Sequence, residues 1–246
     1  MSLKLNRRHY LTLALASVTT QLHAQTWPVK PVRLVVPFAP GGSTDVVARM
    51  LGQKLTDIWG QSVVIENRAG AGGNLGADAV AKSAPDGHTL LFASGSITIN
   101  PSIYTNMPFD TVRDLTPITN VASGPMLIVV NDKAPWRNLK DLIQDAKANP
   151  GKINFGSAGI GSQIHLAAEN FADAAGIEIA HVPYKGEALS YNDLISQQIQ
   201  MMVGNIAAAS ALLGPGRLRA LAVTGSTRSP LLPDRSEEHT SELQSH

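Results

Sequence analysis

The chain has 246 residues, and its 43% hydrophobic and 16% charged residues are typical of a globular protein rather than a disordered one. Of its 20 basic and 19 acidic side chains, four and three lie in the terminal segments described next, which leaves 16 of each and no basic surplus for nucleic acid. The absence of cysteine excludes disulfide bonds, thiolate metal sites and a cysteine nucleophile.

Residues 1–24 have the pattern of an export signal. Lys4, Arg7 and Arg8 precede an apolar stretch at residues 10–18, and Ala24 follows as a small residue before the expected cut. A basic start, a short apolar run and a small residue predict a cleaved signal peptide and a periplasmic protein. Because the two arginines are adjacent, both the general secretory route and the twin-arginine route remain open.

The final segment, residues 235–246, reads RSEEHTSELQSH and resembles a translated sequencing adapter. It contains one leucine and no hydrophobic periodicity, so it offers no face to pack against a core. We therefore expect this tail to be an artefact and the native sequence to be cut off near Asp234.

Residues 25–123 are expected to form a first α/β lobe. The short apolar run 32–36 predicts a buried parallel strand, and an apolar stripe in 44–59 predicts an amphipathic helix that ends before Gly60. A strand at 62–66, a helix at 74–83 and a strand at 89–93 complete a βαβαβ unit. The helical stripe consists of Val46, Val47, Met50, Leu51, Leu55 and Ile58.

Residues 124–223 repeat the alternation and predict a second lobe. The expected strands are 126–130, 152–155, 179–182, 199–203 and 218–223, and the expected helices are 139–148, 162–175, 188–197 and 206–213. Residues 224–234 are expected to begin a return toward the first lobe. Two α/β lobes joined in this way form a clamshell, in which ligands bind at the strand ends that face the cleft.

The connection between the first predicted strand and the first predicted helix is the strongest candidate site. It reads PFAPGGSTD, and its candidate ligand-binding residues are Phe38, Ala39, Gly42, Ser43, Thr44 and Asp45. A helix N-terminus behind a glycine-rich loop attracts anions through free N–H groups and the helix dipole. We expect Ser43 or Thr44 to cap the helix and also to hydrogen-bond a carboxylate. The same pattern is compatible with a plain tight turn.

A counterpart follows in the second lobe, where the loop GSAGIGS lies between a predicted strand and a predicted helix. Two such loops on one cleft would hold an anion from both lobes, through Ser157, Ala158, Gly161 and Ser162. His165, three residues beyond the loop, and Tyr184, at a strand end, are further candidates for ligand contact. The alternatives are a packed helix histidine and an ordinary turn.

Other chemistry finds little support in the sequence. The glycines of GAGGNLG miss the dinucleotide-binding spacing, because Leu75 stands where the third glycine is needed. His88, His165 and His181 show no metal-ligand spacing, and no nucleophile–base pair is apparent. We therefore expect no cofactor, no metal and no enzymatic activity.

Several longer motifs together resemble the Bug-type extracytoplasmic receptors of tripartite tricarboxylate transporters. They include PFAPGGSTD at 37–45, ENRAGAGG at 66–73, APDGHTL at 84–90 and HVPYKG at 181–186, and the likeness extends from Trp27 to Asp234. The resemblance implies a two-lobed α/β clamshell, the type II-like fold of periplasmic binding proteins. It also implies a monomer that holds a small carboxylate between its two loops and delivers it to membrane permease subunits.

Two departures from the family pattern bear on the ligand and on the fold. Family members often have Phe-Asp-Asn where this chain has Val203, Gly204 and Asn205, of which Asn205 is retained as a candidate ligand-binding residue. The missing carboxylate argues against a ligand with an amino group, because a buried ammonium would lack a partner. The chain also stops where the family continues with elements that return to the first lobe, which predicts an incomplete first lobe.

Two other classes of function remain open at this stage. A periplasmic sensor that presents its ligand to a two-component kinase would use the same two lobes, and an exported α/β enzyme is the remaining alternative. A receptor for a small carboxylate is the function that the sequence favours.

Overall fold

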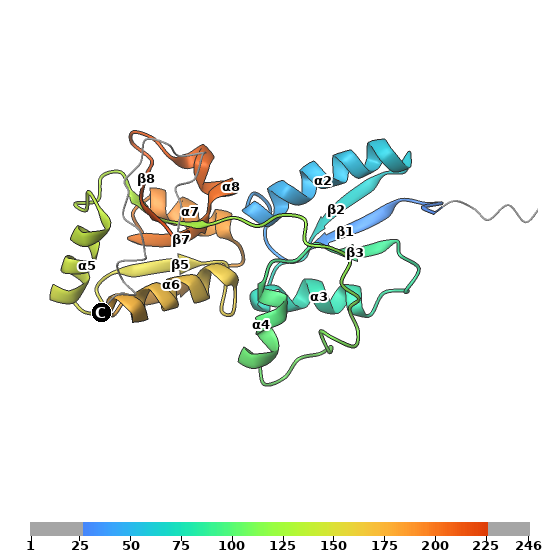
Figure 1. The fold of residues 1–246 in the computed structure, drawn as a ribbon, viewed down its shortest axis with the longest axis horizontal. Helices are drawn as coiled ribbons and strands as arrows, with labels where there is room; N and C mark the ends of the chain where they lie inside the picture. The colour runs from blue at the N-terminus through green and yellow to red at the C-terminus, as the bar shows by residue number, and fades with distance from the viewer. Residues whose placement is uncertain (1–26, 226–246) are drawn as a thin grey trace, which may run out of the picture.

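The computed structural model describes residues 27–225, which form two α/β lobes that lie side by side (Figure 1). The predicted signal peptide and the adapter-like tail lie outside the described residues, as does nearly all of the predicted return segment at 224–234. One lobe is built on a three-stranded sheet and the other on a five-stranded sheet. This architecture agrees with the predicted two-lobed α/β fold.

The first lobe has the predicted βαβαβ order. Its sheet is parallel, in the order β2-β1-β3, and consists of β1 (Val32–Val36), β2 (Val63–Asn67) and β3 (Thr89–Leu91). Two helices cover opposite sides of this sheet (Figure 1): α2 (Ser43–Trp59) packs on β1 and β2, and α3 (Asn74–Ala81), which follows the short turn η2 (Ala71–Gly73), packs on β1 and β3. The loop between β1 and α2 therefore lies at the carboxyl edge of the sheet, where parallel sheets bind ligands.

The sequence does not predict helix α4 (Ser96–Ile103), which follows β3. Its β-branched residues and the internal Pro101 weaken the helical signal. Just after α4, the Tyr104 hydroxyl donates a hydrogen bond to the carbonyl of Ile160 in the other lobe, at 2.8 Å. This helix therefore positions one of the contacts between the lobes.

The second lobe is a mixed sheet in the order β6-β5-β7-β4-β8. Its strands are β4 (Met126–Asn131), β5 (Asn154–Ser157), β6 (Ala180–Pro183), β7 (Met201–Asn205) and β8 (Leu218–Val223). Strand β4 runs antiparallel to both of its neighbours, whereas β5 runs parallel to β6 and to β7. The sequence does not reveal this direction, because a strand buried on both faces reads as the same apolar run either way.

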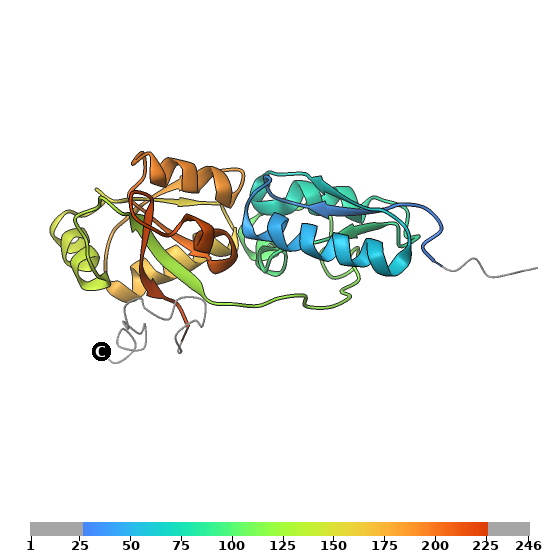
Figure 2. The same cartoon turned by 90° about the horizontal axis from the view of Figure 1, so that it is seen from above.

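The helices of the second lobe follow the predicted order. They are α5 (Leu139–Ala148), α6 (Gln163–Ala175), α7 (Glu187–Ile195) and α8 (Ile206–Ala209), and α8 continues into the turn η3 (Ser210–Leu212). The single helix predicted at 206–213 is thus a short α-helix followed by a 3₁₀ turn. Residues 115–125 have no regular structure and connect the two lobes as a long strap (Figure 2).

Most of the buried apolar core belongs to the second lobe, where every residue of β4 is buried. In the first lobe the buried cluster consists of Leu34, Val36 and Ala48. An open groove runs along α2 and is lined by Val47, Leu51 and Leu55 of the predicted stripe. Two other members of that stripe differ from the expectation, because Met50 and Ile58 are 67% and 74% exposed.

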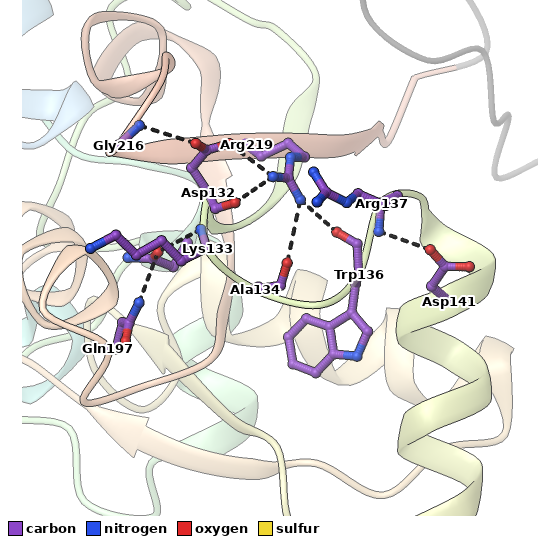
Figure 3. Close-up of polar contacts among 10 residues, drawn as sticks. Asp132, Lys133, Ala134, Trp136, Arg137, Asp141, Gln197, Gly216 and Arg219 are labelled. Carbon is purple, nitrogen blue, oxygen red and sulfur yellow. Dashed lines mark hydrogen bonds and ion pairs between the residues drawn. The ribbon is translucent and has the colours of Figure 1, made fainter.

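Arg219 on the edge strand β8 ties that strand to the chain that follows β4 (Figure 3). Its guanidinium donates to the Trp136 carbonyl at 2.8 Å and to the Asp132 carboxylate at 2.9 Å, and it also contacts the Asp132 carbonyl. The Gly216 N–H, followed by Arg219, holds the pKa of Asp132 below its ordinary value. The planar fork of arginine serves several acceptors at once, which a lysine ammonium does not match.

We expect Arg219→Lys to lower the free energy of unfolding by about 1–3 kcal/mol, because charge-assisted hydrogen bonds to a half-buried loop are lost. Denaturant unfolding measures this change. Arg217→Lys is the matched control, since the Arg217 side chain is exposed and makes one long bond of 3.4 Å to the Ala211 carbonyl. Equal losses in the two variants would contradict this role of Arg219.

Candidate ligand-binding site

A small cavity, partly open to solvent, lies between the two lobes, and both predicted loops contribute to its wall. The predicted residues that line it are Phe38, Gly42, Thr44, Asp45, Ala158, Ser162 and Asn205. The lining residues that the sequence analysis missed are Ser94, Gln163, Ile164 and Glu187.

The first loop is fixed by Asp45, which is 3% exposed. Its carboxylate accepts hydrogen bonds from the Gly41 N–H at 3.0 Å, from Arg49 at 2.9 Å and from the Asn67 amide at 2.9 Å. Burial alone would raise the pKa of Asp45, but these bonds outweigh it and hold the pKa below its ordinary value. Asp45 is therefore an ionised group whose charge is balanced by Arg49.

The expected helix cap at Ser43 or Thr44 is wrong. Gly42 is the N-cap of α2, and no side chain accepts a hydrogen bond in the capping position. The Ser43 hydroxyl instead accepts a hydrogen bond from the Ala208 N–H of the second lobe, at 3.0 Å. Thr44 faces the cavity, and its N–H donates to no acceptor within residues 27–225. The Thr44 N–H at the α2 N-terminus is thus left free for a ligand.

The second loop places the N-terminus of α6 on the opposite wall. Ser162 is the N-cap, and its hydroxyl accepts from the His165 N–H at 3.3 Å. In the part of the chain that the structure describes, the N–H groups of Gln163 and Ile164 have no acceptor. Both residues line the cavity. The two helix N-termini therefore leave backbone donors from both lobes at the wall of one cavity.

Four hydrogen bonds hold the lobes together around this cavity. Besides the Tyr104–Ile160 and Ser43–Ala208 bonds, the Ala39 N–H donates to the Lys185 carbonyl at 3.1 Å, and the Ser43 N–H donates to the Glu187 carboxylate at 3.0 Å. Ala39, a predicted ligand-binding residue, therefore has its N–H taken by the opposite lobe. The structure is a closed arrangement of the two lobes.

Several other predicted residues lie outside the cavity wall. Ser157 is fully buried, and its hydroxyl accepts from the Gly159 N–H at 3.0 Å. Gly161 has a φ of +77° and lies against Asn100, so its contact is with α4. The Tyr184 hydroxyl donates to Asp193 at 2.6 Å, and burial followed by this bond raises the pKa of Tyr184 to about 12. These three residues shape the loops rather than the wall.

His165 packs on His181, with ring centroids 4.1 Å apart, instead of facing the cavity. The Nε2 atom of His181 lies 2.6 Å from the Ser157 hydroxyl, a serine–histidine pair that the sequence does not reveal. Because Ser157 is inaccessible, this pair fixes the loop and does not present a nucleophile. Within residues 27–225, no three histidine or acidic side chains gather in a way that would hold a metal ion.

Because Gly204 replaces an acidic residue, the sequence analysis expected no carboxylate at the end of β7. The structure places the carboxylate of Glu187, at the start of α7, at that position. Its side chain is buried, lines the cavity and accepts from the Asn205 N–H at 2.6 Å. A Cβ placed on Gly204 would lie 3.4 Å from the Glu187 carboxylate. The acidic group missing from position 204 is therefore supplied by a neighbouring helix. No sequence pattern pointed to Glu187, because an acidic residue in a first helical turn is ordinary dipole compensation.

A family model described as the tripartite tricarboxylate transporter family receptor matches residues 47–243. The protein BugT of Bordetella pertussis is 40% identical over 230 residues, which cover 92% of this chain and 71% of BugT. The structure of the periplasmic binding protein BugD superposes with a TM-score of 0.80 at 37% identity, covering 85% of this chain and 70% of BugD.

Two further solved structures contain small acids. An R. palustris protein with adipate superposes with a TM-score of 0.81 at 38% identity, covering 85% of this chain and 70% of that protein. MatC from Rhodopseudomonas palustris with bound malate superposes with a TM-score of 0.79 at 29% identity, covering 88% of this chain and 74% of MatC.

The histidine pair predicts acid sensitivity of the fold. Burial, aided by the neighbouring His165, lowers the pKa of His181 from 6.5 to about 4. The unfolded chain then binds more protons than the folded one between these values, so stability falls as the pH drops from 6.5 to 4. We expect the melting temperature of His181→Gln to fall less over this window than that of the wild type. If the melting temperatures of the variant and the wild type fell equally over this window, this role of His181 would be contradicted. The difference in melting temperature at pH 8 measures the cost of the substitution itself.

Proposed function

Because this chain belongs to the tripartite tricarboxylate transporter receptor family, we propose that it captures a small carboxylate in the cavity between its lobes and delivers it to a membrane permease. The family consists of binding proteins without enzymatic activity. The capture step uses the residues of the cavity wall, and the delivery step follows from membership of a transporter receptor family.

The observation that carries this proposal is the pair of helix N-termini at the wall of one cavity between the lobes. The N–H groups of Thr44, Gln163 and Ile164 have no acceptor within the described residues. A carboxylate supplies acceptor oxygens for such donors, and the dipoles of α2 and α6 favour its negative charge. The hydroxyls of Thr44, Ser94 and Ser162 add donors from side chains at the same wall. Relatives with adipate or malate are consistent with a ligand of this class.

We further propose that the protein is exported and monomeric. The predicted signal peptide, cleaved near Ala24, places the mature chain in the periplasm. None of the helices within residues 27–225 combines the length and apolarity needed to span a membrane. A periplasmic location is the one in which a solute receptor meets both its ligand and the outer face of a permease.

We expect linear carboxylates of about four to six carbons, including adipate and malate as probes, to raise the melting temperature by binding the folded state. Thr44→Val keeps the shape of the side chain and removes a hydroxyl from the wall. This change should weaken the best-binding acid about 5- to 100-fold in calorimetry, because a buried ligand oxygen loses a donor. Thr98→Val is the control, since the exposed Thr98 hydroxyl bonds to the Gly95 carbonyl. If no acid binds, or if Thr44→Val binds like the control, the site is wrongly placed.

A further inference from the structure

The cavity has an unusual electrostatic composition for a site that binds an anion. Among the described residues that line it, none is Lys, Arg or His, and the ionisable ones are Asp45 and Glu187. Asp45 is balanced by Arg49 at 2.9 Å. Among residues 27–225, Glu187 has no cationic partner, because its hydrogen bonds there come from backbone N–H groups, an amide and a phenol.

The Glu187 carboxylate already occupies part of the anion-binding end of α2. One of its oxygens accepts from the Ser43 N–H at 3.0 Å, and the other accepts from the Asn205 N–H at 2.6 Å and from the Tyr191 hydroxyl at 3.3 Å. Glu187 is 5% exposed, so solvent screens its charge poorly. A ligand carboxylate placed at this end would meet a second negative charge and would have lost one of the helix donors.

Local packing keeps Glu187 in this position. A Cβ on Gly204 would lie 1.9 Å from the Tyr191 hydroxyl, so the glycine makes room for the tyrosine that supports the carboxylate. On the other side, a Cβ on Gly42 would lie 3.3 Å from the Glu187 Cβ. Glu187 is therefore enclosed by close contacts from both lobes.

Free backbone donors and the Glu187 carboxylate line the same cavity. The N–H groups of Gln163 and Ile164 lie at the start of α6, and Glu187 lies at the start of α7 and accepts a hydrogen bond from the start of α2. A small ligand in the cavity would therefore meet backbone donors and, within the described residues, a carboxylate without a cationic partner. Complementarity requires an acceptor that faces the α6 donors and a hydrogen-bond donor that faces Glu187.

We propose that Glu187 is a specificity-determining residue, which selects carboxylates whose far end carries a hydroxyl or ammonium group and disfavours a second carboxylate. This inference rests on the proposed function and names the substrate class within it. It reverses the expectation that an amino group has no partner in the site. It also separates this chain from a receptor for simple dicarboxylates.

The test uses acids of matched length that differ in the far end alone. One series is succinate, 4-hydroxybutanoate and 4-aminobutanoate, and the other is adipate, 6-hydroxyhexanoate and 6-aminohexanoate. Calorimetry on the wild-type chain should rank the hydroxy or amino acid of one series at least about tenfold tighter than its dicarboxylate, since like charges placed together in a buried site repel strongly. This ranking needs no variant.

Glu187→Gln removes the charge and keeps a carbonyl oxygen that accepts the Ser43 N–H. We expect it to reduce the preference at least about tenfold and to improve binding of the dicarboxylate. Glu178→Gln makes the same change of charge at an exposed position before β6 and should keep the wild-type ranking. Cooperative melting of both variants confirms that they fold.

The outcomes separate the two proposals. If the wild type binds dicarboxylates as tightly as the matched hydroxy and amino acids, or if Glu187→Gln keeps the wild-type ranking, the specificity role is overturned while carboxylate capture stands. If none of the six acids binds to the wild type, carboxylate capture in this cavity is overturned, and the specificity role falls with it.

Discussion

The hydrogen bond from the Ser43 N–H to the buried Glu187 carboxylate joins the two lobes at the wall of the cavity. A charge this deeply buried must be surrounded by donors, and the available donors come from both lobes. The start of α2, the end of β7 and the start of α7 are therefore held in one relative position. The closed arrangement, the volume of the cavity and the sign of its charge all depend on this group.

Backbone N–H groups at helix termini, and not cationic side chains, provide the hydrogen-bond donors for an anion in this site. Free N–H groups at α2 and α6 face the cavity, and no lysine, arginine or histidine is present among its described lining residues. Backbone donors fixed by two helices have a defined direction, whereas a long cationic side chain would adapt to many anions. Such a site distinguishes ligands by the placement of their oxygens, and the position of a single carboxylate then alters the selected class.

The alternation of strands and helices could be predicted because each element has a local signature. Leu139–Ala148 and Leu218–Val223 match their predicted bounds, and the βαβαβ order of the first lobe is as expected. The failures also have physical causes. Helix α4 carries β-branched residues and a proline, and the direction of β4 leaves no trace in a fully buried strand. Capping of α2 failed because the Ser43 hydroxyl binds the opposite lobe instead of its own helix.

By itself, the sequence determined the two lobes, the two strand–loop–helix connections and the family, because turns, glycine-rich loops and hydrophobic periodicity are local properties of the chain. The tertiary structure alone decided which side chains reach the cavity. Ser157 and His165 turn away into a packed cluster with His181, while Glu187 turns inward to meet Ser43, which lies 144 positions earlier in the chain. The sequence could not foresee that meeting, because the direction of a side chain between two lobes depends on how distant segments pack and on where a buried charge finds its donors.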